Sequence, residues 1–244
     1  MRTGTHDERD FLEPPCTPDT MAYHSVRTAL LAAIAEVAPE FRGRVLDLAC
    51  GGMPYRELIM REGDVSEYIG VDLPPGENSP NRPDVVWDGS RIPLEGDSVD
   101  AVLMTEFLEH HADAEAVLRE VHRVLCPGGL AFATVPFIWN LHELPHDEYR
   151  YTPFSLERHF RNAGFGDVRV KALGGWNRSL AQMLGLWVQF SGVSGVRRAV
   201  LKRAFFRLYV WLLRTDKPPT DFDGAQNSMF SGLTALARKA EGGE

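Results

Sequence analysis

The stretch RVLDLACGGMP at residues 44–54 decides the fold class. Its first six residues form a mostly apolar run of strand length, and the small residues Cys50, Gly51 and Gly52 end that run. A short helical pattern then begins at residue 55. A strand that passes through a small-residue turn into a helix lets the backbone approach a ligand closely at the helix N-terminus. This stretch therefore predicts an α/β protein with a ligand site at the turn.

The same alternation continues outward from this stretch. Six more strand-like runs follow, at 68–72 (YIGVD), 84–88 (DVVWD), 99–105 (VDAVLMT), 130–137 (LAFATVPF), 168–173 (VRVKAL) and within 228–240. Helical spacing of apolar residues predicts helices over 21–38, 55–62, 113–125, 154–165 and most of 177–215. Such alternation is typical of a parallel sheet covered on both faces. We expect seven strands in a mostly parallel sheet, helices on both faces and a helical insertion before the last strand.

Four segments are expected along the chain. Residues 1–20 form a polar N-terminal arm, which is either mobile or an ordered lid. The ligand-binding core covers residues 21–176. A helical insertion, both basic and apolar, covers residues 177–227, and the final strand and C-terminus cover residues 228–244.

Composition limits the function classes. The 244 residues carry 34 acidic and 26 basic side chains, a net charge of -8, which disfavours a general nucleic-acid-binding surface. The three cysteines, Cys16, Cys50 and Cys126, are far apart and form neither a disulfide framework nor a zinc motif. Neither a secretory leader nor an apolar run long enough to span a bilayer is visible, so we expect a cytoplasmic protein.

Carboxylates follow three successive predicted strands. Asp47 lies at the end of the first, Asp72 at the end of the second and Asp88 at the end of the third. The carboxyl ends of parallel strands are where such sheets bind ligands, and a carboxylate there suits the hydroxyls of a ribose. The alternative for each residue is a structural one, in which it caps the next helix or turn.

The four segments VLDLACGGMP, YIGVD, VVWDGSRIPLEGDSVDAVLMTEFLEHH and LREVHRVLCPGGLAFATVP together resemble the class I S-adenosylmethionine-dependent methyltransferases, and within them the type 11 subgroup. The resemblance covers about residues 44–165 and implies a Rossmann-like fold with S-adenosylmethionine as cofactor. It implies the following cofactor-binding residues: Asp47, Ala49, Gly51, Asp72, Leu73, Asp88, Gly89, Ser90, Thr105 and Glu106. Of these, Asp47 would fix the amino-acid end, Asp72 the ribose and Asp88 the adenine amino group.

The glycine positions of that family are altered in this sequence. Ala49, Gly51 and Met53 stand where many members have three glycines. Bulk at two of these positions would damage a pyrophosphate site, where backbone nearly touches phosphate. The change therefore disfavours a nicotinamide-dependent oxidoreductase and leaves room for a cofactor site of unusual shape.

Two clusters are candidates for activating an acceptor. The first is Glu109-His110-His111 after the fourth strand, where a histidine is either a base or a packing residue. The second is the polar, aromatic segment at 137–152 after the fifth strand. We predict His142 or His146 as the general base, with His110 in reserve. The candidate substrate-binding residues are Trp139, Glu143, Tyr149, Arg150 and Tyr151.

The second cluster also bears on the acceptor. It resembles an HExPxDxxRYT stretch of methyltransferases encoded with sugar and polysaccharide genes, which implies a sugar or glycan-type hydroxyl acceptor. Arg150 would then hold an acidic group of the acceptor, unless it pairs with Asp147 or Glu148. Pro145 interrupts the spacing of His142 and His146, so we expect no metal ion. A tailoring methyltransferase of a secondary metabolite, acting on oxygen or nitrogen, and a non-catalytic cofactor-binding protein are the alternatives.

Charge is segregated towards the end of the chain. Residues 168–215 contain nine basic residues and no acidic one. Within 197–214, Leu201, Phe205, Leu208 and Leu212 fall on one helical stripe. This segment is a packed helix, a homodimer interface, a substrate lid or a peripheral contact with an anionic membrane.

Overall fold

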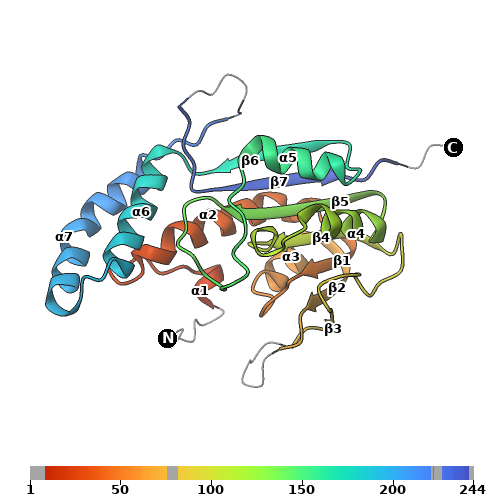
Figure 1. Cartoon of the computed structure of the whole chain (residues 1–244), viewed down its shortest axis with the longest axis horizontal. Helices are drawn as coiled ribbons and strands as arrows, with labels where there is room; N and C mark the ends of the chain where they lie inside the picture. Colours follow the sequence, from red (N-terminus) through yellow and green to blue (C-terminus); the bar gives the residue numbers. More distant parts are fainter. Residues whose placement is uncertain (1–8, 76–81, 221, 223–226, 242–244) are drawn as a thin grey trace. The chain divides into compact units, whose positions relative to one another are not determined.

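The computed structural model describes residues 9–75, 82–220, 222 and 227–241, and its strands form one seven-stranded sheet in the order β3-β2-β1-β4-β5-β7-β6 (Figure 1). The strands are β1 (Arg42–Leu48), β2 (Asp64–Asp72), β3 (Val85–Val86), β4 (Val99–Thr105), β5 (Leu125–Pro136), β6 (Val168–Leu173) and β7 (Gly232–Arg238). The pairs β1–β2, β1–β4, β2–β3 and β4–β5 are parallel. All seven predicted strands are confirmed.

The strand order reverses beside β1. From β1 the chain proceeds through β2 to β3 on one side, and β4 then pairs with the other edge of β1. This reversal is the place where open α/β sheets bind ligands, at the carboxyl ends of the strands. Backbone hydrogen bonds join Gly128 to Lys239 and Phe137 to Ser231, so β7 runs antiparallel to β5. The sheet is therefore Rossmann-like, mixed and mostly parallel, as predicted.

The helices predicted from residue 21 onwards occur where the sequence places them, and one further short helix lies within the expected N-terminal arm. They are α1 (Arg9–Leu12), α2 (Met21–Val37), α3 (Arg56–Glu62), α4 (Ala114–Val124), α5 (Pro153–Asn162), α6 (Trp176–Phe190) and α7 (Gly195–Arg214), with 3-10 turns η1 (Ala38–Glu40) and η2 (Leu108–His110). Asp113 caps the N-terminus of α4, because its side chain accepts a hydrogen bond from the Ala116 amide at 2.9 Å. The pair α6 and α7 is the predicted insertion before the last strand.

Two compact units make up the chain. The sheet unit contains Ile34–Val135, His142–Val170 and Thr234–Glu244, and the helical unit contains Met1–Ala33, Pro136–Leu141 and Lys171–Leu233. In the sheet unit, side chains of β1 and β4 form a core that is closed to water, as at Leu46 and Leu103, which are 0% exposed.

The helical unit is held together by residues far apart in the sequence. Met21 of α2 packs in one buried cluster with Ala181 and Val188 of α6 and with Tyr209 and Leu212 of α7. Leu201 and Phe205 pack against this cluster, as the predicted stripe implies. Leu208, which the same stripe includes, is instead 44% exposed. The prediction was wrong there because Tyr209, one position further, fills the buried face.

Two further boundaries differ from expectation. The sequence predicts the fifth strand at residues 130–137, yet β5 begins at Leu125 because the Gly128 and Gly129 backbones exchange hydrogen bonds with Lys239 beyond β7. Of the expected arm at 1–20, residues 1–8 lie outside the described residues, and the remainder contains α1. Over the part of the chain that the structure describes, every helix is too short or too polar to cross a membrane.

Candidate functional site

The turn after β1 has a left-handed backbone at three alternate residues. Ala49, Gly51 and Met53 have φ angles of 60°, 52° and 53°. These are the three positions where the family resemblance expects glycine, the residue that adopts this conformation without steric cost. Alanine and methionine there strain the turn, and such strain is typical of ligand-binding segments.

Ala49→Gly is therefore expected to raise the free energy of unfolding by about 0.5–1 kcal/mol. A left-handed backbone costs an ordinary residue roughly 1–2 kcal/mol, and part of the gain is offset because glycine makes the unfolded chain more flexible. Urea unfolding measures the change. As a matched control, Ala35→Gly on the exposed face of α2 should cost about 1 kcal/mol. Equal losses at both positions would contradict the strain at Ala49.

Asp47 lies beneath this turn at the end of β1. Its side chain is buried, and its Oδ2 accepts a hydrogen bond from the Tyr68 hydroxyl at 2.7 Å. Its Oδ1 has no hydrogen-bond partner among the described residues. Burial, with the nearby charge of Asp72, raises the pKa of Asp47 to about 7. A buried carboxylate oxygen without a partner suits a cationic group of a ligand.

Asp72 lies at the end of β2 and connects it to the turn after β1. Its Oδ2 accepts a hydrogen bond from the Gly51 amide and its Oδ1 one from the Leu73 amide, both at 2.7 Å. The structural alternative for Asp72 is therefore present, and each oxygen keeps a second lone pair for a ligand hydroxyl. The Leu73 side chain is 52% exposed, so its apolar surface is accessible to a ligand ring.

Asp72→Ala is expected to weaken cofactor binding by about 1–3 kcal/mol, because the variant loses an acceptor for two ribose hydroxyls and loosens the Gly51 turn. Isothermal titration calorimetry with S-adenosylhomocysteine measures this loss. The matched variant Asp84→Ala removes a carboxylate that accepts a hydrogen bond from the Gly70 amide of β2. It should weaken cofactor binding less than Asp72→Ala does. Unchanged affinity in Asp72→Ala would remove this residue from the site.

A tight turn follows β3. The Asp88 Oδ1 accepts hydrogen bonds from the amide and the hydroxyl of Ser90, which lower the pKa of Asp88. Gly89 has a φ of 87°, and its carbonyl lies 3.0 Å from Nε2 of His111. The His111 ring stacks on Trp87. His111 is thus a packing residue of this turn.

At the end of β4, the backbone is again strained. Glu106 has a φ of 50°, and its amide donates to the backbone and side-chain oxygens of Thr134 on β5. The Thr134 hydroxyl donates to Oε1 of Glu106 at 3.0 Å. Burial raises the pKa of Glu106 to about 7. The neighbouring Thr105 is the last residue of β4 and is partly exposed.

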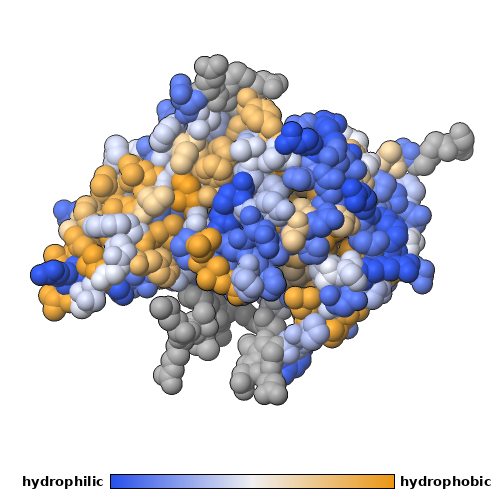
Figure 2. All heavy atoms as spheres, viewed as in Figure 1, coloured by the Kyte–Doolittle hydropathy of each residue, from blue (hydrophilic) through white to orange (hydrophobic). Residues whose placement is uncertain are grey.

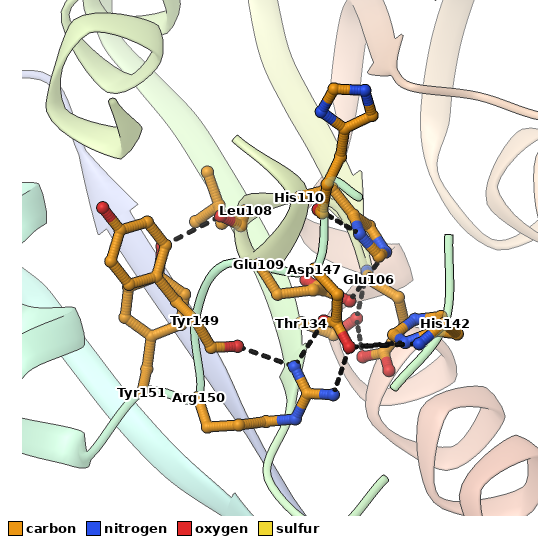
Figure 3. Close-up of polar contacts among 11 residues, drawn as sticks. Glu106, Leu108, Glu109, His110, Thr134, His142, Asp147, Tyr149, Arg150 and Tyr151 are labelled. Atoms are coloured by element: carbon orange, nitrogen blue, oxygen red, sulfur yellow. Dashed lines mark hydrogen bonds and ion pairs between the residues drawn. The ribbon is translucent and has the colours of Figure 1, made fainter. Parts of the chain in front are cut away.

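The loop after β5 is organised by Asp147 (Figure 3). The Arg150 guanidinium donates to both carboxylate oxygens, at 2.6 and 2.9 Å. The His142 amide donates to Oδ2, and the His142 ring nitrogen Nδ1 lies 3.3 Å from the same oxygen. The ion pair with Arg150 lowers the pKa of Asp147. Arg150 thus makes the contact that the structural alternative predicts, and Asp147 orients the His142 ring.

Glu109, His110 and His142 lie together beside this loop. One ligand-type atom of each lies within 4.8 Å of the others, and the His110 and His142 rings are 4.6 Å apart between centroids. Burial, with the nearby charge of Glu106, raises the pKa of Glu109 well above its usual range. Burial, with the nearby charge of His110, lowers the pKa of His142, so its ring is neutral at pH 7.

The other predicted substrate residues have varied environments. The Tyr149 and Tyr151 hydroxyls donate to the carbonyls of Ala112 and Leu108, and Tyr151 is buried. Glu143 and His146 are exposed. Trp139 belongs to the helical unit, where its ring contacts Tyr23.

Sequence reasoning missed Glu109 as a member of the cluster and treated it only as a neighbour of His110. His142, which lies near it in the fold, is 33 residues away, beyond α4 and β5, so no local spacing indicated that the two residues lie together. A surface hollow of about 410 Å³ lies elsewhere, among residues that precede β1 and begin β5. This hollow lies at the start of β1 and β5, whereas the strained turns follow the ends of β1 and β4.

Part of this sequence is similar to known proteins. Residues 46–133 match the family described as a methyltransferase domain. A ubiquinone biosynthesis O-methyltransferase of Azorhizobium caulinodans is 29% identical over 149 residues, which cover 50% of this chain and 58% of that protein. The chain spans 38–64% of the length of the curated relatives that it matches.

Solved structures show the same fold. Phosphoethanolamine N-methyltransferase 2 of Haemonchus contortus, in complex with S-adenosyl-L-methionine, has a TM-score of 0.54 and 17% identity, over 99% of this chain and 62% of that one. The cyclase SpnF has a TM-score of 0.57 and 17% identity, over 98% of this chain and 86% of that one. Because a cyclase shares the fold, the fold alone does not establish methyl transfer. The domain match and the relatives show that residues 46–133 are similar to methyltransferases.

The residues at the strand ends fit S-adenosylmethionine. The partnerless Oδ1 of Asp47 would receive the ammonium group of its amino-acid end, and the left-handed turn above it has no side chain at Gly51. Asp72 would hold the ribose, and Leu73 would cover a ring of the cofactor. The Asp88-Gly89-Ser90 turn would face the adenine.

Proposed function

We propose that this protein transfers a methyl group from S-adenosylmethionine to a hydroxyl of a sugar or glycan-type acceptor. The observation that carries the proposal is the orientation of His142 by Asp147 in the same unit as the cofactor turn. A neutral imidazole held by an ionised carboxylate is the arrangement of a general base. The likeness to O-methyltransferases supports oxygen as the atom methylated.

When bound, the cofactor supplies an electrophilic methyl group on a sulfonium. His142 accepts the proton of the acceptor hydroxyl while the oxygen forms its bond to the methyl carbon and the carbon–sulfur bond breaks. Asp147 stabilises the imidazolium that forms, and Arg150 keeps Asp147 ionised and fixed. Tyr149 and Glu143, at the exposed edge of the loop, are the proposed acceptor contacts.

A panel of acceptors tests the proposal. Release of S-adenosylhomocysteine is measured with nucleotide sugars, with catechols and phenols, and with primary amines. We expect turnover with the sugars. Turnover confined to phenols would favour a tailoring enzyme of quinone-like or secondary metabolites, which the ubiquinone-related relatives support. Turnover confined to amines would contradict a hydroxyl acceptor.

We also propose that α6 and α7 contact an anionic membrane surface, with the remainder of the protein in the cytoplasm. Large apolar side chains are exposed along one stripe of α6, at Trp176, Leu180, Met183, Trp187 and Phe190. On α7, Val196, Val200, Leu208 and Trp211 are exposed between basic residues. Figure 2 shows apolar residues gathered over these two helices. Exposed apolar side chains beside arginines are typical of interfacial helices.

Flotation with vesicles tests this contact. The protein should bind vesicles that contain anionic lipid, and salt should release most of it, because each basic side chain contributes about 1 kcal/mol near such a surface. Reversal of charge at Arg203 and Arg207 should abolish binding, whereas reversal at Arg158, exposed on α5, should not. If the wild type fails to float, or instead dimerises through α7, the surface is not a membrane contact.

A further inference from the structure

Glu109 is a buried carboxylate without a hydrogen-bond donor from any other residue that the structure describes. Its side chain is 0% exposed, and neither oxygen accepts a hydrogen bond from another described residue. The nearby cation is Arg150, whose guanidinium donates hydrogen bonds to both oxygens of Asp147 instead. The His110 Nε2 is 3.7 Å from Glu109 Oε1, beyond hydrogen-bond distance. A carboxyl group removed from water in this way is either protonated or neutralised by a close positive charge, and it ionises when a cation binds beside it.

The two histidines present the right atoms to supply ligands beside Glu109. The His110 Nδ1 lies 3.0 Å from the carbonyl oxygen of His146, so Nδ1 is the protonated donor and Nε2 carries the lone pair. The His142 Nδ1 faces the ionised Asp147 at 3.3 Å, so its Nε2 carries the lone pair as well. Metal-binding histidines are oriented in this manner, by a carbonyl or carboxylate on the other ring nitrogen.

We propose that Glu109, His110 and His142 bind a divalent first-row metal ion. Their ligand atoms already lie within 4.8 Å of one another (Figure 3). Two imidazoles with one carboxylate favour ions such as Mn²⁺ or Zn²⁺ over Mg²⁺ or Ca²⁺. Glu106 adds a second carboxylate beside Glu109, which further favours a cation here. This proposal departs from the sequence-based expectation of a metal-free site.

This inference rests on the proposed methyl transfer to a hydroxyl, and it assigns His142 the role of a metal ligand in place of the general base. When bound, the ion would lower the pKa of an acceptor hydroxyl, which would then give its proton to water near neutral pH. The oxygen then bonds to the methyl carbon, the carbon–sulfur bond breaks, and S-adenosylhomocysteine leaves as a neutral thioether. His142 then acts as a ligand, and Asp147 is a positioning residue that acts through the His142 ring.

The test uses the full chain after treatment with EDTA. Calorimetry with MnCl₂ and with ZnCl₂ should show one ion per chain, and each ion should raise the Tm. Glu109→Gln keeps the shape of the side chain and removes the buried charge, so it should fold, bind the ions at least 100-fold more weakly and show no rise in Tm. His159→Ala is the matched control, because His159 pairs with Glu115 in the same unit and should leave binding unchanged.

A second variant separates ligands from their support. Asp147→Asn should weaken ion binding about 10–100-fold, as expected when the partner of a ligating histidine is changed. S-adenosylhomocysteine affinity, measured in the same samples, should stay within about twofold of wild type in Glu109→Gln. Cofactor binding without any ion binding would overturn the metal site and leave His142 as a free base. Equal ion affinity in Glu109→Gln and wild type would also overturn it. Ion binding without cofactor binding would contradict only the proposed function.

Discussion

Asp47→Asn is expected to weaken S-adenosylhomocysteine binding at least about 100-fold at pH 8 while making the protein more stable. The asparagine oxygen still accepts the Tyr68 hydrogen bond, so the local structure is kept. The variant loses the negative charge that would pair with the ligand ammonium, and a buried charge-assisted contact is worth several kcal/mol when one partner is removed. Calorimetry gives the affinity, and urea unfolding gives the stability.

The raised pKa of Asp47 sets the direction in which pH changes both the stability of the fold and the cofactor affinity. Because folding raises the Asp47 pKa from 3.8 to about 7, this group favours the folded state below pH 4, and that contribution is lost as pH rises through 7. Each pKa unit corresponds to about 1.4 kcal/mol, so we expect Asp47→Asn to gain roughly 1–3 kcal/mol over wild type at pH 8 and little at pH 4.

Cofactor affinity should change in the opposite direction. A cationic ligand group binds the ionised form, so wild-type affinity should fall as pH decreases below 7, whereas Asp47→Asn should show a much flatter profile. An asparagine variant with wild-type affinity, or with a wild-type pH profile of unfolding, would show that Asp47 is a structural residue only.

His142→Ala should lower turnover roughly 10²–10⁴-fold on the best acceptor, with S-adenosylhomocysteine affinity unchanged. The loss is expected whether His142 accepts the proton directly or holds an ion, since both roles need the oriented ring. Rates of S-adenosylhomocysteine release at saturating cofactor measure it.

His146→Ala is the matched control, because that side chain is exposed and only its backbone carbonyl contacts His110. We expect it to stay within a few-fold of wild type. If His110→Ala, His142→Ala and His146→Ala all keep the full rate, no histidine is needed, and positioning of the acceptor alone accounts for the reaction.

Most of the sheet could be predicted from the sequence because its signals are local. The apolar run ending at Leu48 and the small-residue turn behind it identify strand, turn and helix within a few residues. The start of β5 could not be predicted, since Gly128 and Gly129 read as a turn and only their pairing with Lys239, more than 100 residues away, makes them part of a strand.

The cofactor side of the site could also be predicted from the sequence. In the reactive cluster, only His110 and His142 could be predicted, and Glu109 could not. Asp47 and Asp72 follow directly from the strand pattern. The contact of Glu109 with His142 depends on how η2 and the loop after β5 fold against each other, where the Glu148 and Tyr149 amides both donate to the Glu109 carbonyl. Such a contact requires the tertiary structure.

Calorimetric titration with S-adenosylhomocysteine, with NAD in a parallel cell, tests the central assignment most directly. We predict one S-adenosylhomocysteine bound per chain, displaced by S-adenosylmethionine, and no heat from NAD. Tight binding of NAD with no binding of S-adenosylhomocysteine would contradict the assignment of the strand-end site to S-adenosylmethionine.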